Sequence, residues 1–204
     1  MTDLHDGAPE PAREPDLFVD FANESRLSSP EHPDPDGDVA RLGSWLRAAG
    51  LVAAAPPRQR LERELPAFRE LRVLVRSVAD RLDAGRAPTK AQVAGINRVM
   101  RAGTHYHALR AEPDGTRFSM EPVGDGLEQA RSAVAGSLAH YLADHDLRRL
   151  RVCADDTCRW LFVDRSPAGR RRWCDMRTCG NQAKVARHRA RARDLLNETP
   201  ASVS

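Results

Sequence analysis

Four cysteines carry the clearest chemistry in this sequence, and all of them lie between residues 153 and 179. They are Cys153, Cys158, Cys174 and Cys179, spaced as C-x4-C, fifteen residues, then C-x4-C. Two short loops that each carry two thiolates can enclose one tetrahedral zinc ion, and the separation suits the two halves of a structural site. We therefore predict that the four cysteines hold one structural zinc ion.

Three other chemistries are open to the same thiols. Disulfides suit a secreted protein, but the N-terminus is acidic and Pro-rich and lacks the features of a secretory signal. Catalytic redox chemistry prefers a C-x-x-C pair, which the chain lacks. Catalytic zinc needs an open coordination position, which four cysteines fill. A structural site is favoured, and because so small a module buries little apolar surface, the metal is expected to supply most of its stability.

The residues around the cysteines predict the elements that bring them together. "RWLFVD" (Arg159–Asp164) is apolar and β-branched, "RSPAG" is a turn, and "RRRWC" returns. This is a β-hairpin that places Cys158 and Cys174 together at its open end. Gly180 permits an unusual backbone, and Asn181 is a good N-cap for a helix over "QAKVARHRARARDLL". Loop, hairpin and helix together indicate a treble-clef-like module.

Positive charge is concentrated around this module. From Leu147 onward the chain carries 14 Lys and Arg against 6 Asp and Glu, although the net charge of the whole protein is only +3. A basic block on an otherwise acidic chain favours a polyanionic partner, most often nucleic acid. The simpler alternative is that these residues only solvate a helix.

The basic residues fall into two groups. Three arginines leave the hairpin turn, and four side chains form one stripe on the helix at positions i, i+3, i+4 and i+7. The predicted DNA contacts are Arg170, Arg171, Arg172, Lys184, Arg187, His188 and Arg191. Val185, Ala192 and Leu196 lie about a third of a turn away and are predicted to dock on the hairpin. Arg189 and Arg193 extend the positive field.

Two tryptophans flank the predicted hairpin. Trp160 and Trp173 can cover the zinc site and form the small core of the module. The alternative is that they stack on the bases of a single-stranded nucleic acid.

The region before the module predicts a mostly helical domain. Leu17–Ser25 alternates apolar and polar residues and is expected to be a short strand or an entry turn. Helical spacing begins at Asp38, a predicted N-cap, with Gly50 as the stop. The segment over residues 55–85 is one helix or two joined near Pro66.

A third helical segment, then a hairpin and a last helix complete this domain. Residues 87–103 are predicted to contain a helix with Thr89 as its N-cap and Gly103 as its stop. Residues 104–123 alternate around Asp114-Gly115, a strong hairpin signal. Helical spacing returns over residues 124–146. The fold class is therefore α+β: a helical domain with a small hairpin, then the zinc module.

Length and composition set the organisation. We expect a disordered acidic tail over 1–16, a helical domain over 17–146 for sensing or dimerisation, the finger over 147–196 and a flexible tail over 197–204. No apolar run approaches the roughly 20 residues that cross a bilayer. A cytoplasmic protein without a membrane partner is the expectation.

The C-terminal stretch resembles the CGNR zinc finger, with "CGNQ" at Cys179, Gly180, Asn181 and Gln182. The preceding region resembles the ABATE domain through "LFVDFANES" and "WLRAAGLV". The resemblance implies a bacterial transcription regulator of the stress-induced type with a zinc-dependent DNA-binding C-terminus. Gln182 replaces the usual Arg of the motif, and Lys184 is the neighbouring cation that can compensate.

The leading functional hypothesis is a transcription regulator that binds duplex DNA, and it is not an enzyme. One finger reads few bases, so useful specificity favours a homodimer on two half-sites. A small-molecule effector is a further hypothesis. The alternatives are an RNA- or ribosome-associated protein, and an enzyme with the finger as scaffold. A pocket lined by carboxylates or histidines of shifted pKa would favour the enzyme.

Overall fold

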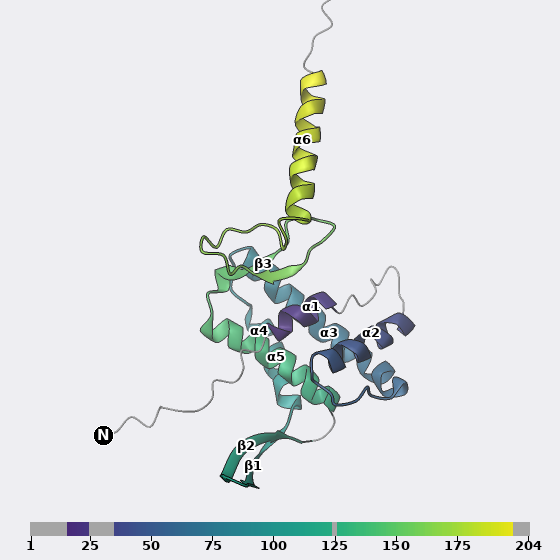
Figure 1. Cartoon of the computed structure of the whole chain (residues 1–204), viewed down its shortest axis with the longest axis vertical. Coiled ribbons are helices and arrows are strands. Elements are labelled where there is room, and N and C mark those ends of the chain that lie inside the picture. The colour runs from purple at the N-terminus through teal and green to yellow at the C-terminus, as the bar shows by residue number, and fades with distance from the viewer. Residues whose placement is uncertain (1–15, 25–34, 124–125, 198–204) are drawn as a thin grey trace, which may run out of the picture. The chain divides into compact units, whose positions relative to one another are not determined.

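The computed structural model describes residues 16–24, 35–123 and 126–197. Its chain forms two compact units, one made of Met1–Val78 with Ala87–Leu147 and one made of Ala79–Arg86 with Arg148–Ser204. Figure 1 labels most of the elements of both. The predicted tails, 1–16 and 197–204, lie outside the described residues except for Asp16 and Asn197.

The first unit is mostly helical, as predicted. In chain order its elements are α1 (Leu17–Glu24), α2 (Pro35–Ala48), α3 (Arg58–Asp83, of which the last turn and a half belongs to the second unit), α4 (Lys90–Ala102), β1 (His105–Glu112), β2 (Gly115–Pro122) and α5 (Gly126–Asp144). Where side chains and backbone are described, no helix is long and apolar enough to cross a bilayer.

Helix α1 lies in the core of this unit, where a strand or turn was predicted. The ring centroids of Phe21 lie 5.2 Å from Trp45 and 6.1 Å from Phe68, and Phe18 lies 5.3 Å from Tyr141. Leu17 to Asn23 are buried except Asp20. The segment spans only about two turns, and an apolar run this short does not distinguish a buried helix from a strand.

Helix α2 begins at Pro35, so the prediction that Asp38 is its N-cap was wrong. Asp38 lies inside the helix and is fully buried. Its carboxylate accepts from Arg41 at 2.7 Å and from Arg69 of α3 at 2.5 Å. A buried carboxylate needs such partners, and the sequence pattern does not reveal one that is 31 residues away.

Helix α3 is a single helix with Pro66 inside it, which settles the choice between one helix and two. Pro66 is exposed, while Leu65 and Phe68 beside it are buried. The helix ends at Asp83, just before the predicted stop at Gly85, whose φ of 69° suits glycine. Arg86 then donates its N–H to the Arg81 carbonyl at 2.8 Å, which closes a Schellman-type cap.

The next elements follow the predicted pattern. Thr89 caps α4 and forms a capping box with Gln92. Strands β1 and β2 pair antiparallel, but Glu112 pairs with Gly115, so the two-residue loop is Pro113-Asp114 rather than Asp114-Gly115. Helix α5 then packs against both α1 and α4.

The second unit contains the end of α3, β3 (Leu150–Val152), β4 (Leu161–Val163) and α6 (Cys179–Asn197). It also contains the 3-10 turn η1 (Leu147–Arg149) except for Leu147. The predicted hairpin has a different partner strand. Leu161 pairs with Val152 on β3, before the first cysteine, and residues 170–173 form no strand. The returning segment is held instead by one backbone bond, from the Ala154 N–H to the Arg172 carbonyl at 2.8 Å.

Candidate metal centre and basic surface

The four cysteine thiols form one cluster. One sulfur from each of Cys153, Cys158, Cys174 and Cys179 lies within 4.8 Å of all the others, and none is in a disulfide. Cys153 and Cys179 are buried, and the other two are half-buried. The four thiols therefore form one group rather than two separate disulfide pairs in this structure.

The spacing of the sulfurs fits a tetrahedral metal ion. Cys174 Sγ lies 3.7 Å from Cys158 Sγ and 3.8 Å from Cys179 Sγ. Four sulfurs placed about 2.3 Å from a central zinc ion are separated by about 3.8 Å along each edge of the tetrahedron. The donor set, four thiols without water or carboxylate, is that of a structural rather than a catalytic site.

Each cysteine pair sits on a tight loop shaped by an aspartate. In the first loop, Asp155 Oδ1 accepts the N–H of Thr157 at 3.0 Å, and its carbonyl accepts the N–H of Cys158 at 3.0 Å. In the second, Asp175 Oδ1 accepts the N–H of Thr178 at 3.0 Å. These Asx turns fold the chain back so that both sulfurs of a pair face the same point.

These hydrogen bonds also lower the pKa of both carboxyls, chiefly through Thr157 for Asp155 and Thr178 for Asp175. Neither aspartate was among the residues predicted from the sequence. The available signal was the Thr-Cys pair that ends each loop, with an aspartate shortly before it.

The thiols differ in how readily they ionise. Burial opposes ionisation of Cys153, but hydrogen bonds from the backbone of Cys174 and Asp155 outweigh it and lower its pKa. Burial, and then hydrogen bonding with Cys158, raise the pKa of Cys174 and of Cys179. Thiols crowded in this way retain protons that a divalent cation would displace on binding.

A second network, built around Asp164, holds the loop between β4 and the third cysteine. Asp164 is 1% exposed. Its carboxylate accepts the N–H of Ser166 at 3.0 Å, the hydroxyl of Ser166 at 2.6 Å and the N–H of Arg171 at 2.8 Å. Burial opposes ionisation, but these bonds prevail and the pKa of Asp164 is lowered.

Arg149 holds the same loop through hydrogen bonds. Its guanidinium donates to the carbonyl of Ser166 at 2.6 Å and to that of Asp164 at 3.2 Å. Gly169, with a φ of 59°, lies so close that an added Cβ would stand 2.7 Å from Arg149 Nη1. The loop therefore has its own support, independent of the cysteines.

The three arginines after the turn have different surroundings. The Arg171 side chain points inward: it donates to the carbonyls of Trp173 and Cys174, and its guanidinium carbon lies 5.3 Å from the Phe162 ring centroid. Arg170 is exposed. Arg172 is exposed and lies 5.3 Å from the Trp173 ring centroid.

The two tryptophans are both half-buried. The Trp160 carbonyl accepts the N–H of Cys153 at 2.8 Å, and Trp173 lies beneath Arg172.

Two arginines link the finger to the end of α3 within the second unit. Arg159 Nη2 lies 3.0 Å from Asp80 Oδ1, and Arg151 Nη1 lies 3.9 Å from Asp83 Oδ1. Arg159 directly follows Cys158 and has a φ of 50°, the only positive φ among the described non-glycine residues. These arginines are part of the fold of the module.

Helix α6 starts two residues before the predicted N-cap. Cys179 is its first residue, so Gly180 and Asn181 lie in the first turn, and the Gln182 N–H bonds to the Thr178 carbonyl at 3.0 Å. Gly180 has no positive φ, which corrects the expectation of an unusual backbone. It lies against Met176, whose Sδ would be 3.1 Å from an added Cβ. The Gln182 side chain is exposed.

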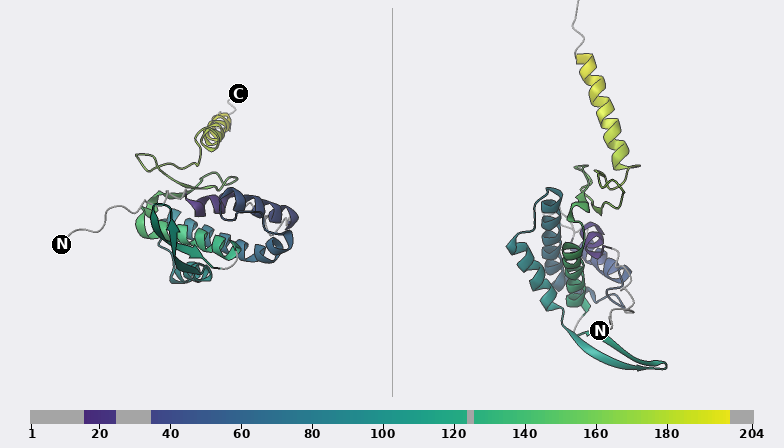
Figure 2. Two further views of the ribbon diagram at one scale, coloured as in Figure 1. Left: turned by 60° about the horizontal axis from the view of Figure 1, so that its bottom comes forward. Right: turned by 90° about the vertical axis from the view of Figure 1, so that its left-hand side faces the viewer.

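Most of the described α6 side chains from Gln182 to Arg191 are exposed to solvent. Val185 is 41% exposed, so the prediction that it docks on the hairpin was wrong, and the side chains of Ala192 and Leu196 lie outside the described residues. Figure 2 shows the helix leaving the cysteine loops. Among the described side chains of α6, the basic residues Lys184, Arg187, Arg189 and Arg191 are exposed, as is His188.

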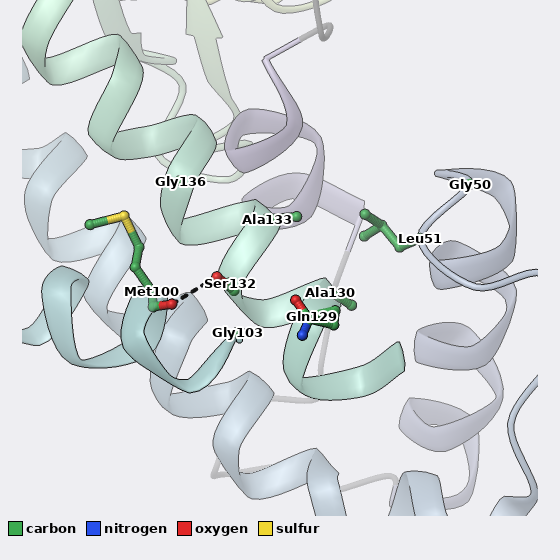
Figure 3. A pocket seen from close by; sticks show the side chains of 9 residues that line it. All are labelled: Gly50, Leu51, Met100, Gly103, Gln129, Ala130, Ser132, Ala133 and Gly136. Carbon is green, nitrogen blue, oxygen red and sulfur yellow. Dashed lines mark hydrogen bonds between the residues drawn. The ribbon is translucent and has the colours of Figure 1, made fainter. Parts of the chain in front are cut away.

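The first unit contains a pocket of about 430 Å³ beside α5 (Figure 3). Its walls include Leu51, Met100, Gln129 and Ser132, together with small residues. The Ser132 hydroxyl donates to the Met100 carbonyl at 3.0 Å, and the Gln129 amide donates to the Thr104 carbonyl at 2.6 Å. None of the residues that line this pocket carries an ionisable side chain.

A helical domain followed by a compact four-cysteine module defines a zinc-finger protein with a helical N-terminal domain. Residues 149–192 match the family model of the CGNR zinc finger, and residues 15–145 match that of ABATE, described as "Putative stress-induced transcription regulator". The chain belongs to this ABATE family. A search of curated proteins finds no match.

Proposed function

We propose that this protein is a zinc-dependent transcription regulator that binds duplex DNA through α6 and the neighbouring loop. One zinc ion, held by the four cysteines, would fix the start of α6. The observation that carries the proposal is that α6 begins at a residue of the thiol cluster and then runs on with its cations exposed. The family description, a transcription regulator, supports the same function.

The charges of α6 suit a groove rather than a flat surface. Lys184, Arg187 and Arg191 share one side of the helix at i, i+3 and i+7, while Arg189 lies on a different side. An α-helix about 10–12 Å across fits the major groove, which has phosphates along both walls. Cations on two sides of one helix can therefore contact both strands.

The surroundings of the three loop arginines refine the predicted contacts. Arg170 and Arg172 are exposed and remain in the proposal as phosphate contacts. Arg171 uses its guanidinium on two carbonyls and on the Phe162 ring, so we assign it a structural role instead. In this proposal His188 and Lys184 contact the phosphate backbone of the DNA. Lys184 supplies the positive charge that Gln182 lacks.

The first unit would then sense, dimerise or recruit. Its pocket beside α5 is the candidate place for a small-molecule effector, because it combines apolar walls with polar groups.

Binding to labelled duplex DNA, followed by fluorescence anisotropy, tests the proposal. We expect binding at about 50 mM salt that weakens steeply as salt rises. The triple variant Lys184→Ala/Arg187→Ala/Arg191→Ala should lose most of the affinity and flatten the salt slope by about three. The matched control is Lys90→Ala/Arg98→Ala/Arg101→Ala on α4, which removes three exposed cations from the first unit.

Two results would contradict the proposal. The first is absence of duplex binding at low salt. The second is an equal loss of affinity in the α4 control, which would show a response to net charge alone. Competition by single-stranded RNA that exceeds competition by duplex DNA would favour the RNA alternative. Cys174→Ser tests the zinc requirement in the same assay.

A further inference from the structure

The pocket beside α5 is lined in part by a glycine that no packing contact requires. Gly136 lies in the interior of α5, and a Cβ added to it would meet no atom within 4 Å. Its φ is not positive, so the backbone does not demand glycine either. Gly103, in the same pocket, differs because an added Cβ would collide with Ser132. Since glycine weakens a helix interior relative to alanine, the open space at Gly136 has no explanation in the stability of the helix.

The side chain of Gln129, also in the pocket lining, has an acceptor that lacks a donor. Its amide nitrogen donates to the Thr104 carbonyl at 2.6 Å and to the Val123 carbonyl at 2.8 Å. These two bonds fix the orientation of the amide, because the reversed amide would set its oxygen against two carbonyl oxygens. Gln129 Oε1 is buried and finds no hydrogen-bond donor among the residues that the structure describes. A buried acceptor without a donor is destabilising, and a ligand that supplies the donor removes that penalty.

The other lining residues restrict the chemistry of such a ligand. The Ser132 hydroxyl donates to the Met100 carbonyl at 3.0 Å, so its oxygen can only accept a further hydrogen bond. Leu51, Met100 and Ala133 add apolar surface, and Figure 3 shows Ala133 on the same helix as Gln129. No lining residue is ionisable, so a charge on the ligand would lose its hydration without gaining a counter-charge. The volume, about 430 Å³, is that of a small-molecule site.

We propose that this pocket binds an uncharged, largely apolar small molecule that carries an N–H or O–H donor, as an amide or a phenol does. The donor bonds to Gln129 Oε1, and the apolar body covers Gly136. The terminal torsion of a glutamine side chain is soft, so a bound donor can draw this oxygen out of its buried position. The inference names the chemical class of the effector, and it rests on the proposed function for the regulatory role of that effector.

Gln129 also connects the pocket to the hairpin of the same unit. Thr104 directly precedes β1 and Val123 directly follows β2, and the Val123 N–H bonds to the Thr104 carbonyl at 2.8 Å. The Gln129 amide thus holds both ends of the hairpin base. A donor bonded to Oε1 polarises this amide and strengthens its two N–H bonds. Ligand binding should therefore slow hydrogen exchange at the Val123 N–H.

An NMR titration of the full-length protein, without DNA, tests the proposal. The compounds are indole, phenol and acetanilide, each paired with a methylated counterpart that lacks the donor: 1-methylindole, anisole and N-methylacetanilide. We expect a compound with a donor to shift the Met100 methyl signal and the Gln129 side-chain amide signals. Its counterpart should bind about tenfold more weakly, because it leaves Oε1 without a partner. Benzoate, which is charged, should produce no shift of these signals.

Two variants locate the binding. Gly136→Leu should abolish the shifts, because its side chain occupies the open space, and it should leave the urea midpoint of the protein unchanged or higher. The matched control is Ser137→Leu, which adds the same side chain at the next position of α5, outside the pocket lining, and should bind as the wild type does. Gln129→Met should bind a donor compound and its methylated counterpart equally, since it has no acceptor oxygen.

Four results would overturn the proposal. They are absence of shifts with every compound, equal binding of donor compounds and their counterparts to the wild type, stronger binding of benzoate, and unchanged binding to Gly136→Leu. Hydrogen exchange at Val123 that does not slow would overturn the link to the hairpin. The duplex assay is separate: a protein that binds duplex DNA but none of these compounds loses only the pocket proposal. One that binds a compound but no duplex DNA loses only the proposed function.

Discussion

Arg159 Nη2 lies 3.0 Å from Asp80 Oδ1, which ties the residue after the second cysteine to the last turns of α3. The sequence places these two residues 79 positions apart. Arg159 holds a left-handed backbone conformation to make the contact. Glycine would adopt this conformation with less strain, but it would lack the guanidinium that pairs with Asp80.

Replacing Arg159 separates these two effects. Both Arg159→Ala and Arg159→Gly lose the exposed ion pair, which contributes at most about 1 kcal/mol. Only glycine relieves the backbone, so Arg159→Gly should be more stable than Arg159→Ala by about 1 kcal/mol. Urea unfolding of the metal-loaded protein, followed by tryptophan fluorescence, measures the difference. Identical midpoints would show that the left-handed conformation is not strained.

Arg171 is expected to matter for folding more than for DNA affinity. Arg171→Ala removes the bonds to the carbonyls of Trp173 and Cys174 and the contact with Phe162. A loss of about 2 kcal/mol in the free energy of unfolding follows. Arg170→Ala, an exposed neighbour, should change stability by less than about 0.5 kcal/mol but weaken DNA binding. A larger loss of stability in Arg170→Ala, together with a larger loss of DNA affinity in Arg171→Ala, would contradict this prediction.

Asp164 predicts a pH dependence of the second unit. Asp164→Asn places an amide N–H₂ against the Ser166 and Arg171 groups, which are themselves donors. The free energy of unfolding should therefore fall by about 1–3 kcal/mol at neutral pH. Because the folded pKa is lowered, the carboxylate stabilises the protein fully above the ordinary value of about 4. That contribution is lost as pH falls through the folded pKa. The stability gap between wild type and Asp164→Asn should therefore narrow below about pH 4, and a gap that stays constant would contradict the assignment.

Removing the metal is expected to unfold the second unit and spare the first. Zinc binding and folding are coupled in small cysteine modules, so a chelator should expose residues 148–197 to trypsin at least about tenfold faster. The helices of the first unit, with their aromatic core, should survive as a resistant fragment. Cys174→Ser should behave in the same way without chelator. Equal resistance with and without chelator would show that the module does not depend on metal.

Local patterns carried most of the secondary structure. Helical spacing in α3, α4 and α5, the Thr89 cap and the glycine stops at Gly50 and Gly85 all act within a few residues, so the sequence was sufficient to predict them. The cysteine spacing was sufficient in the same way to predict one cluster of four thiols. The family resemblance, read from "CGNQ" and "LFVDFANES", is confirmed over both parts of the chain.

Contacts between distant residues decided the rest. Asp38 became a buried partner of Arg69 rather than a helix cap, and Leu161 paired with Val152 rather than with the segment after the turn. Arg171 turned inward while Arg170 stayed in solvent. In each case the side chain had two acceptable local roles. The choice depended on which partner the fold brought within hydrogen-bonding distance, and a one-dimensional pattern of residue types does not contain that distance.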